Sequence, residues 1–148
     1  MRNNIQFITT RWEQSQRALK EIRTTVFIEE QQVPVEQEWD EFDKQSIHFL
    51  AIHENRPVAT ARLKPDGQIG RMAVIEKYRH QGIGTQLLNK VLLHAKNNNF
   101  SMIYIHAQKK AIGFYKKFDF IYNGNEFMDA GIEHVAMYKL LSNTIKDQ

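Results

Sequence analysis

The sequence predicts a single mixed α/β domain in which an antiparallel meander is followed by a strand–helix–strand crossover. Three apolar segments separated by turn residues over positions 46–74 predict the meander. An amphipathic helical pattern at 82–97, flanked by strand-like segments, predicts the crossover. The chain has 148 residues, 42% of them hydrophobic, and no repeat or linker-like segment, so we expect one domain spanning residues 1–148.

The part of the chain before the meander is expected to hold a strand, a helix and an acidic stretch. Ile5 to Thr9 is a short strand candidate, and apolar residues recur at helical spacing over 13–27. The stretch from Glu29 to Asp43 contains seven acids and no Lys or Arg, and Pro34 interrupts it. It is expected to form one or two helical turns and then a loop.

The strands of the meander are expected at 46–53, 58–64 and 68–74. The first connection reads Glu-Asn-Arg-Pro and the second reads Pro-Asp-Gly. Pro-Asp-Gly favours a tight turn because proline presets φ and glycine accepts a positive φ. The three strands are therefore predicted to be antiparallel neighbours in chain order.

The second half of the chain is expected to contain a parallel strand and two final strands. The helical pattern at 82–97 ends at three asparagines, and the nearly all-apolar segment 101–106 that follows is typical of a strand buried on both faces. A short helix over 108–117 comes next. Two last strands at 118–123 and 133–140, joined by a long polar connection, complete the prediction.

The composition excludes several kinds of site. The chain has no cysteine, so disulfides, thiolate metal ligands and cysteine nucleophiles are absent, which is compatible with the cytoplasm. The N-terminus shows no signal-peptide pattern, and no apolar run reaches the roughly 18 residues of a membrane span. The motifs of serine hydrolases, zinc peptidases and calcium loops are also missing. We therefore expect a cytoplasmic protein without a metal or a membrane partner.

Charge is divided along the chain although the formal net charge is only +3. Eight Lys and Arg residues and no acid lie between positions 77 and 118, in contrast to the acidic stretch. One interpretation is two solvated faces; the other is an anionic ligand near the basic segment and a cationic ligand near the acidic stretch. A nucleic-acid partner is disfavoured because aromatic residues are not interleaved with the basic residues on a predicted sheet face.

A glycine loop joins the third meander strand to the long helix, and it reads Arg79-His80-Gln81-Gly82-Ile83-Gly84. Glycines allow backbone N–H groups to turn toward one point, and the helix N-terminus adds a partial positive charge there. A phosphate or pyrophosphate is the expected ligand. The spacing matches neither the dinucleotide-binding motif nor the P-loop.

The order of elements, with Arg79-x-x-Gly82-x-Gly84 and the segment from Ala111 to Lys117, resembles the GNAT superfamily of N-acetyltransferases. Three further segments are similar to its small YjcF/ElaA-like bacterial branch, namely Val26 to Pro34, His106 to Gln108 and Glu126 to His134. The resemblance covers nearly the whole chain. It implies a transferase that moves an acetyl group from acetyl-CoA to a primary amine, by direct transfer in a ternary complex.

The resemblance also implies where acetyl-CoA is held. Backbone amides of the glycine loop would hold its pyrophosphate, with a charge-assisted contact from the arginine. The third meander strand would pair with the pantetheine arm in a V-shaped gap between that strand and the parallel strand. The residues implied in cofactor binding are Met72, Ala73, Val74, Arg79, Gln81, Gly82, Ile83, Gly84, Thr85 and Gln108.

Catalytic candidates follow from the same resemblance. Tyr115 matches the tyrosine that protonates the leaving thiolate, although it could instead be a packed aromatic. Many members carry a catalytic glutamate on the third meander strand, but 68–72 contains no acid, so the base is either a different residue or a water molecule. His106 is the first alternative, because its ordinary pKa of about 6.5 suits proton transfer. His106 could also be a strand-end residue that only forms hydrogen bonds. Glu29 and His134 are second-line candidates for the base, and they lie in the segments that wall the acceptor pocket in this family.

Two functions remain open at this stage. The first is an N-acetyltransferase acting on a small-molecule or peptide amine, which the acidic stretch suggests is cationic. The second is an acyl-CoA-binding sensor or interaction module, which the missing strand glutamate keeps open. The sequence does not choose between acetyl and longer acyl donors, and it leaves a homodimer open.

Overall fold

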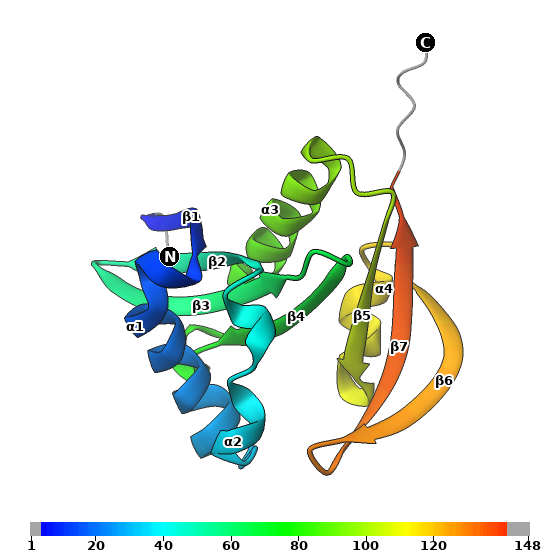
Figure 1. Ribbon diagram of the computed structural model, residues 1–148, viewed down its shortest axis with the longest axis horizontal. Coiled ribbons are helices and arrows are strands. Elements are labelled where there is room, and N and C mark those ends of the chain that lie inside the picture. Colours follow the sequence, from blue (N-terminus) through cyan, green and yellow to red (C-terminus); the bar gives the residue numbers. More distant parts are fainter. Residues whose placement is uncertain (1–3, 142–148) are drawn as a thin grey trace.

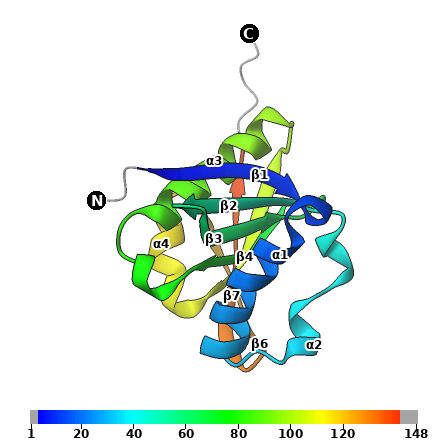
Figure 2. The same ribbon diagram turned by 90° about the vertical axis from the view of Figure 1, so that its left-hand side faces the viewer.

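The computed structural model describes residues 4–141, which form one seven-stranded mixed sheet with helices on both faces (Figures 1 and 2). Within these residues the strand order is β1-β2-β3-β4-β5-β7-β6, and β4 and β5 are the one parallel pair. This arrangement confirms the predicted mixed sheet with its meander and crossover. The strands are β1 (Ile5–Arg11), β2 (Ile47–His53), β3 (Arg56–Leu63), β4 (Gln68–Val74), β5 (Met102–Gln108), β6 (Ile121–Asp129) and β7 (Ile132–Leu140).

The helices pack on the two faces of this sheet. Helix α1 lies over β2, β3 and β4, and α3 packs on the opposite face (Figure 2). No helix within residues 4–141 is long and apolar enough to cross a membrane. The helical elements are α1 (Trp12–Arg23), the π-helix η1 (Thr24–Glu30), α2 (Val35–Glu38), α3 (Ile83–Asn97) and α4 (Ile112–Lys116), with 3₁₀ turns η2 (Glu41–Asp43), η3 (Glu76–Tyr78) and η4 (Lys109–Ala111).

Alternation along the strands divides the core into two clusters. Phe49 of β2 is buried in the cluster under α3, whereas its neighbour Leu50 is buried in the cluster under α1. Successive side chains of a strand point to opposite faces, so one strand can supply both clusters. Helix α3 contributes the apolar face that its spacing predicts, and the buried residues of that face are Ile83, Leu87, Leu88, Val91 and Ala95.

The expected helix over 13–27 is present, but its last turn is a π-helix. The backbone N–H of Gln31 donates to the carbonyl of Val26 at 3.0 Å, which is the wider hydrogen-bonding pattern of such a turn. Both Phe27 and Gln31 then line the cavity described below. The sequence shows the helical periodicity but not this widening.

The prediction that the parallel strand is buried on both faces is wrong. Along β5, Ile103, Ile105 and Ala107 are buried, whereas Met102 and His106 are exposed. The reason is that α4 packs on β5 from one side, while α1 lies over β2–β4 instead of covering β5 from the other.

The predicted long polar connection between the last two strands is also wrong. Strand β6 continues to Asp129 and β7 begins at Ile132, so only two residues join them. These residues, Ala130 and Gly131, both have positive φ, 52° and 78°, as a tight hairpin turn requires. Strand β6 is the edge of the sheet and is largely exposed, so its polar residues do not prevent it from being a strand.

Two irregularities of β4 create the functional cavity. Strands β4 and β5 pair only at Gln68 with Tyr104 and at Ile69 with Ile105, and they separate beyond that point. The two halves of the sheet accordingly splay apart in Figure 1. On its other side β4 has a bulge opposite β3, and Arg71 lies in it with φ of 47°.

Candidate active site

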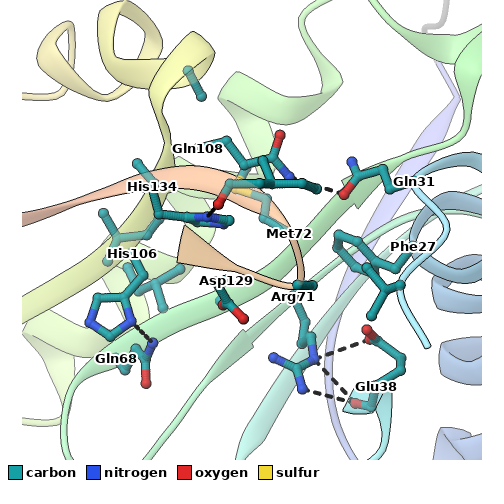
Figure 3. Close-up of a pocket in the computed structure, with 18 of the residues that line it drawn as sticks. Phe27, Gln31, Glu38, Gln68, Arg71, Met72, His106, Gln108, Asp129 and His134 are labelled. Carbon is teal, nitrogen blue, oxygen red and sulfur yellow. Dashed lines mark hydrogen bonds and ion pairs between the residues drawn. The ribbon is translucent and has the colours of Figure 1, made fainter. Parts of the chain in front are cut away.

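A cavity of about 300 Å³ opens where β4 and β5 separate (Figure 3). Its walls come from β4 and β5, from η1 and α2, and from the turn between β6 and β7. Tyr115 of α4 also lines it. Segments that are distant in the chain therefore meet at one point.

Tyr115 presents a hydroxyl that remains protonated. The side chain is 7% exposed, and its hydroxyl lies 3.7 Å from Sδ of Met72. Burial raises the pKa of Tyr115 well above its ordinary value, because the phenolate would lose its hydration. The group can thus donate a proton but cannot act as a base near neutral pH.

His134 lines the cavity, and a backbone carbonyl fixes which of its ring nitrogens carries the proton. The ring is buried, and its Nδ1 lies 2.7 Å from the carbonyl oxygen of Ile132. A carbonyl only accepts, so Nδ1 carries the proton and the neutral ring keeps its lone pair on Nε2. No hydrogen bond to Nε2 is formed by any residue between positions 4 and 141.

His106 is held in the opposite tautomer. The amide of Gln68 accepts from Nζ of Lys64 through Oε1 at 3.0 Å, and its Nε2 lies 3.3 Å from Nδ1 of His106. The amide therefore donates to Nδ1, which leaves the proton of a neutral His106 on Nε2. Desolvation lowers the pKa of His106, as does the nearby His134, while Asp129 opposes these effects.

An aromatic ring separates the two histidines. The ring of Phe127 meets His106 edge-on with centroids 4.9 Å apart, and it stacks on His134 at 5.8 Å. These contacts fix both imidazole planes at the cavity wall. Phe127 was not among the candidates from the sequence, because the segment containing it was expected to be a loop.

Three acids of the acidic stretch, Glu38, Asp40 and Asp43, pair with arginines. Arg23 lies 2.8 Å from both Glu38 and Asp43, and these groups are almost fully buried. Arg62 and Arg71 complete a network in which three arginines meet three carboxylates, the third being that of Asp40. The solvated face expected from the sequence therefore does not describe Glu38 and Asp43, whereas Glu29, Glu36 and Glu41 are exposed.

The glycine loop has the predicted geometry next to the end of β4. Gly82 has φ of 83° and precedes α3. Gly84 lies in the first turn of α3 beside Val74, and a Cβ added at Gly84 would lie 3.8 Å from Cγ2 of Val74. A Cβ at Gly82 would meet nothing within 4 Å, so the space beside the loop is open. Uncapped N–H groups at the start of α3 and this open space fit a pyrophosphate.

Arg79 is already bound by a carboxylate of η1. Its guanidinium contacts both oxygens of Glu30, at 2.6 and 2.8 Å, and its Nε donates to the carbonyl of Val74 at 2.8 Å. Hydrogen bonding to Arg79 lowers the pKa of Glu30. The arginine expected to meet a pyrophosphate therefore also ties η1 to the glycine loop.

The other sequence candidates fall into two groups. Met72 and Gln108 line the cavity, and Gln108 donates to Oε1 of Gln31 at 3.0 Å across it (Figure 3). Glu29 is exposed and does not line the cavity, so the structure does not bring it to the acceptor side. The side chains of Ala73 and Ile83 are buried in the core, which leaves only their backbone groups for a ligand, whereas Gln81 and Thr85 are exposed.

Comparison with known proteins identifies the family. A model of the acetyltransferase (GNAT) domain matches residues 13–141. The chain belongs to the GNAT acetyltransferase family. Within residues 4–141 no cluster of His, Cys, Asp or Glu could hold a metal ion.

Relatives of this GNAT chain include both proteins that its motifs resemble. It is 33% identical to the N-acetyltransferase YjcF of Bacillus subtilis over 122 residues, which is 80% of this chain and 87% of YjcF. It is 32% identical to ElaA of Escherichia coli over 128 residues, or 81% and 84% of the two chains. The crystal structure of E. coli ElaA matches with a TM-score of 0.82 over 91% of this chain and 99% of that one. The predicted resemblance to this branch is confirmed.

A more distant fold neighbour is a GNAT acetyltransferase from Elizabethkingia anophelis that was crystallised with acetyl-CoA bound. It is 20% identical, covers 94% of this chain and 99% of its own, and has a TM-score of 0.64. At this identity the match concerns the fold. Membership of the family implies an enzyme that uses an acyl-CoA.

Proposed function

We propose that this GNAT protein transfers an acetyl group from acetyl-CoA to a primary amine that enters the cavity between β4 and β5. The observation that carries the proposal is the meeting of a proton donor, Tyr115, and a proton acceptor, Nε2 of His134, in one cavity lined by β4, the strand that precedes the glycine loop. Acetyl-CoA supplies a thioester carbonyl that an amine can attack and a thiolate that can leave.

The donor side has the groups that the cofactor needs. Uncapped amides at residues 83–85 and at Gly82 would hold the pyrophosphate, together with the exposed Gln81 and Thr85. Strand β4 has no partner on its β5 side beyond Ile69, so Met72 to Val74 would pair with the pantetheine arm. The backbone N–H near Val74 would donate to the oxyanion as charge develops there.

The acceptor amine must lose a proton before it can attack, because an alkylammonium has a pKa of about 10.4. His134 is the base that we assign, since its Nε2 accepts and its Nδ1 is fixed by a backbone carbonyl. His106, the first candidate from the sequence, carries the proton of its neutral ring on Nε2 and is therefore better suited to donating a hydrogen bond to the acceptor. The base role of His134 and the donor role of His106 both follow from their tautomers, with the proton on Nδ1 of His134 and on Nε2 of His106.

Tyr115 is the proton donor for the leaving thiolate in this scheme. Its hydroxyl already contacts a sulfur atom, Sδ of Met72, and the flexible Met72 side chain can yield that position. Gln108, which is bonded to Gln31, would help to keep the thioester end of the cavity closed.

The proposal is tested by measuring thiol release from acetyl-CoA over a panel of small-molecule and peptide amines. We expect turnover with at least one amine, and we expect His134→Gln to lower kcat about 100-fold or more while the Kd for acetyl-CoA is unchanged. His106→Gln is the matched control and should lower kcat less. Binding of acetyl-CoA without thiol release for any amine would favour the acyl-CoA-binding module instead.

A further inference from the structure

Arg71 occupies an unusual backbone position at the cavity. It lies in the bulge of β4 with φ of 47°, a left-handed conformation that residues other than glycine rarely adopt. The bulge turns its side chain toward the cavity, which it lines, and 24% of the side chain is exposed. Backbone strain of this kind persists where the surrounding contacts enforce it.

Only part of the Arg71 guanidinium is used by the protein. Its Nε lies 3.1 Å from Oε2 of Glu38, and its Nη2 donates to the Glu38 carbonyl at 2.9 Å and to Asp40 at 3.2 Å. Among residues 4–141 no hydrogen bond or ion pair is made to Nη1, which is directed away from Glu38 in Figure 3. Because Nη1 carries two N–H groups, two donors face the cavity.

The charges around the cavity favour an acceptor with both signs of charge. The network of three arginines and three carboxylates is balanced, so it presents no surplus negative charge to a purely cationic amine. The remaining acid of the cavity is Asp129, whose carboxylate forms no hydrogen bond or ion pair with any residue between 4 and 141. It lies close enough to affect the charge of His106, on the side of the two histidines.

We propose that the acceptor is an amino acid, whose carboxylate is bound by Nη1 of Arg71 while its amine faces Asp129 and the two histidines. The inference rests on the transfer reaction proposed above. A carboxylate gains charge-assisted hydrogen bonds at Arg71, whereas the amide or decarboxylated form of the same compound does not. Arg71 directly precedes Met72, so the carboxylate site adjoins the thioester end of the cavity.

The test compares three forms of one compound, such as phenylalanine, phenylalaninamide and phenethylamine, with a lysine series as a second set. For the wild-type protein we expect kcat/KM for the amino acid to exceed that for the amide by about 10- to 100-fold, the range of a charge-assisted hydrogen bond. Arg71→Gln should reduce this ratio to near one and leave the Kd for acetyl-CoA unchanged. Arg62→Gln is the matched control, because it removes an arginine of the same network that does not line the cavity, and it should keep the ratio.

Binding measurements keep the inference separate from the proposed reaction. Calorimetry of the amino acid and its amide, each with the wild-type protein and CoA, should show the same preference for the amino acid. This measurement requires neither turnover nor a variant that folds. Equal binding of the two forms, or a preference for the decarboxylated amine, would overturn the inference even if acetylation occurs. If no amine is acetylated, the proposed function fails, and the ratio of the two binding constants, measured for the wild-type protein and for Arg71→Gln, still decides whether Arg71 selects a carboxylate.

Discussion

The two sides of the cavity are positioned by different kinds of interaction. On the donor side, the backbone provides the binding groups, because Gly82 has a positive φ and the N–H groups at the start of α3 have no side-chain cap. On the acceptor side, buried ion pairs hold α2 and η2 against α1 and the sheet, with Arg23 at the centre. The donor side should therefore be sensitive to its glycines, and the acceptor side to its charges.

The largest expected effect is on the acceptor side. Arg23→Gln removes one partner of two buried carboxylates, Glu38 and Asp43, and we expect the free energy of unfolding to fall by about 3–5 kcal/mol. Urea denaturation measures this change. Arg79→Gln, which breaks a partly exposed ion pair on the donor side, is the control and should cost no more than about 1 kcal/mol. Equal losses for the two variants would contradict the distinction between the two sides.

The same distinction explains what could be predicted from the sequence. The conformation of the glycine loop was predictable because glycine spacing after a strand and before a helix restricts the backbone locally, and the Pro-Asp-Gly turn defined the meander. The acceptor side was not, because Arg23 meets carboxylates 15 and 20 residues away, and no local pattern pairs particular charges. The tautomers of the two histidines could not be predicted either, because the contacts that fix them, such as those of Gln68 with Lys64 and His106, form only in the folded chain.

The mistakes in the fold have a related cause. The nearly all-apolar sequence of β5 predicts burial on both faces, but burial also depends on which helix covers each face, and α1 lies over other strands. The polar residues before β7 predict a loop, although an edge strand such as β6 tolerates them. Because of this second error, Phe127 and Asp129 of β6 are not among the candidate site residues from the sequence.

The next largest effect is expected where the two sides meet, at Tyr115. Tyr115→Phe keeps the packed ring but removes the proton donor, so kcat should fall about 100-fold while the Kd for acetyl-CoA stays constant. Thiol-release kinetics together with equilibrium binding separate the two parameters. An unchanged kcat would make Tyr115 only a packed aromatic that lines the cavity.

A pair of glycine substitutions tests the donor side alone. Gly82→Ala forces alanine into a positive φ and should cost about 1–2 kcal/mol of stability as well as weaken acetyl-CoA binding. Gly84→Ala is the matched control, because its Cβ would make only ordinary contacts of 3.8 and 3.9 Å and alanine is the better helix residue. Thermal unfolding and binding titrations of both variants report the difference. Equal effects at the two positions would mean that φ is not what distinguishes them.

The smallest expected effect concerns Glu30, the residue that connects the two sides through Arg79. Because the side chains of this pair are 39% and 29% exposed, Glu30→Gln should change stability by less than about 1 kcal/mol. It should raise the affinity for CoA a few-fold, since the pyrophosphate would no longer compete with a carboxylate for the guanidinium, and Nε of Arg79 remains held by Val74. Glu76→Gln removes an equal charge near Arg79, and the Glu76 carboxylate forms no hydrogen bond with the Arg79 guanidinium, so this variant should raise the affinity less. A weaker affinity in Glu30→Gln would instead mean that Glu30 holds Arg79 in place for the cofactor. The donor side would then also depend on a charge, supplied by η1.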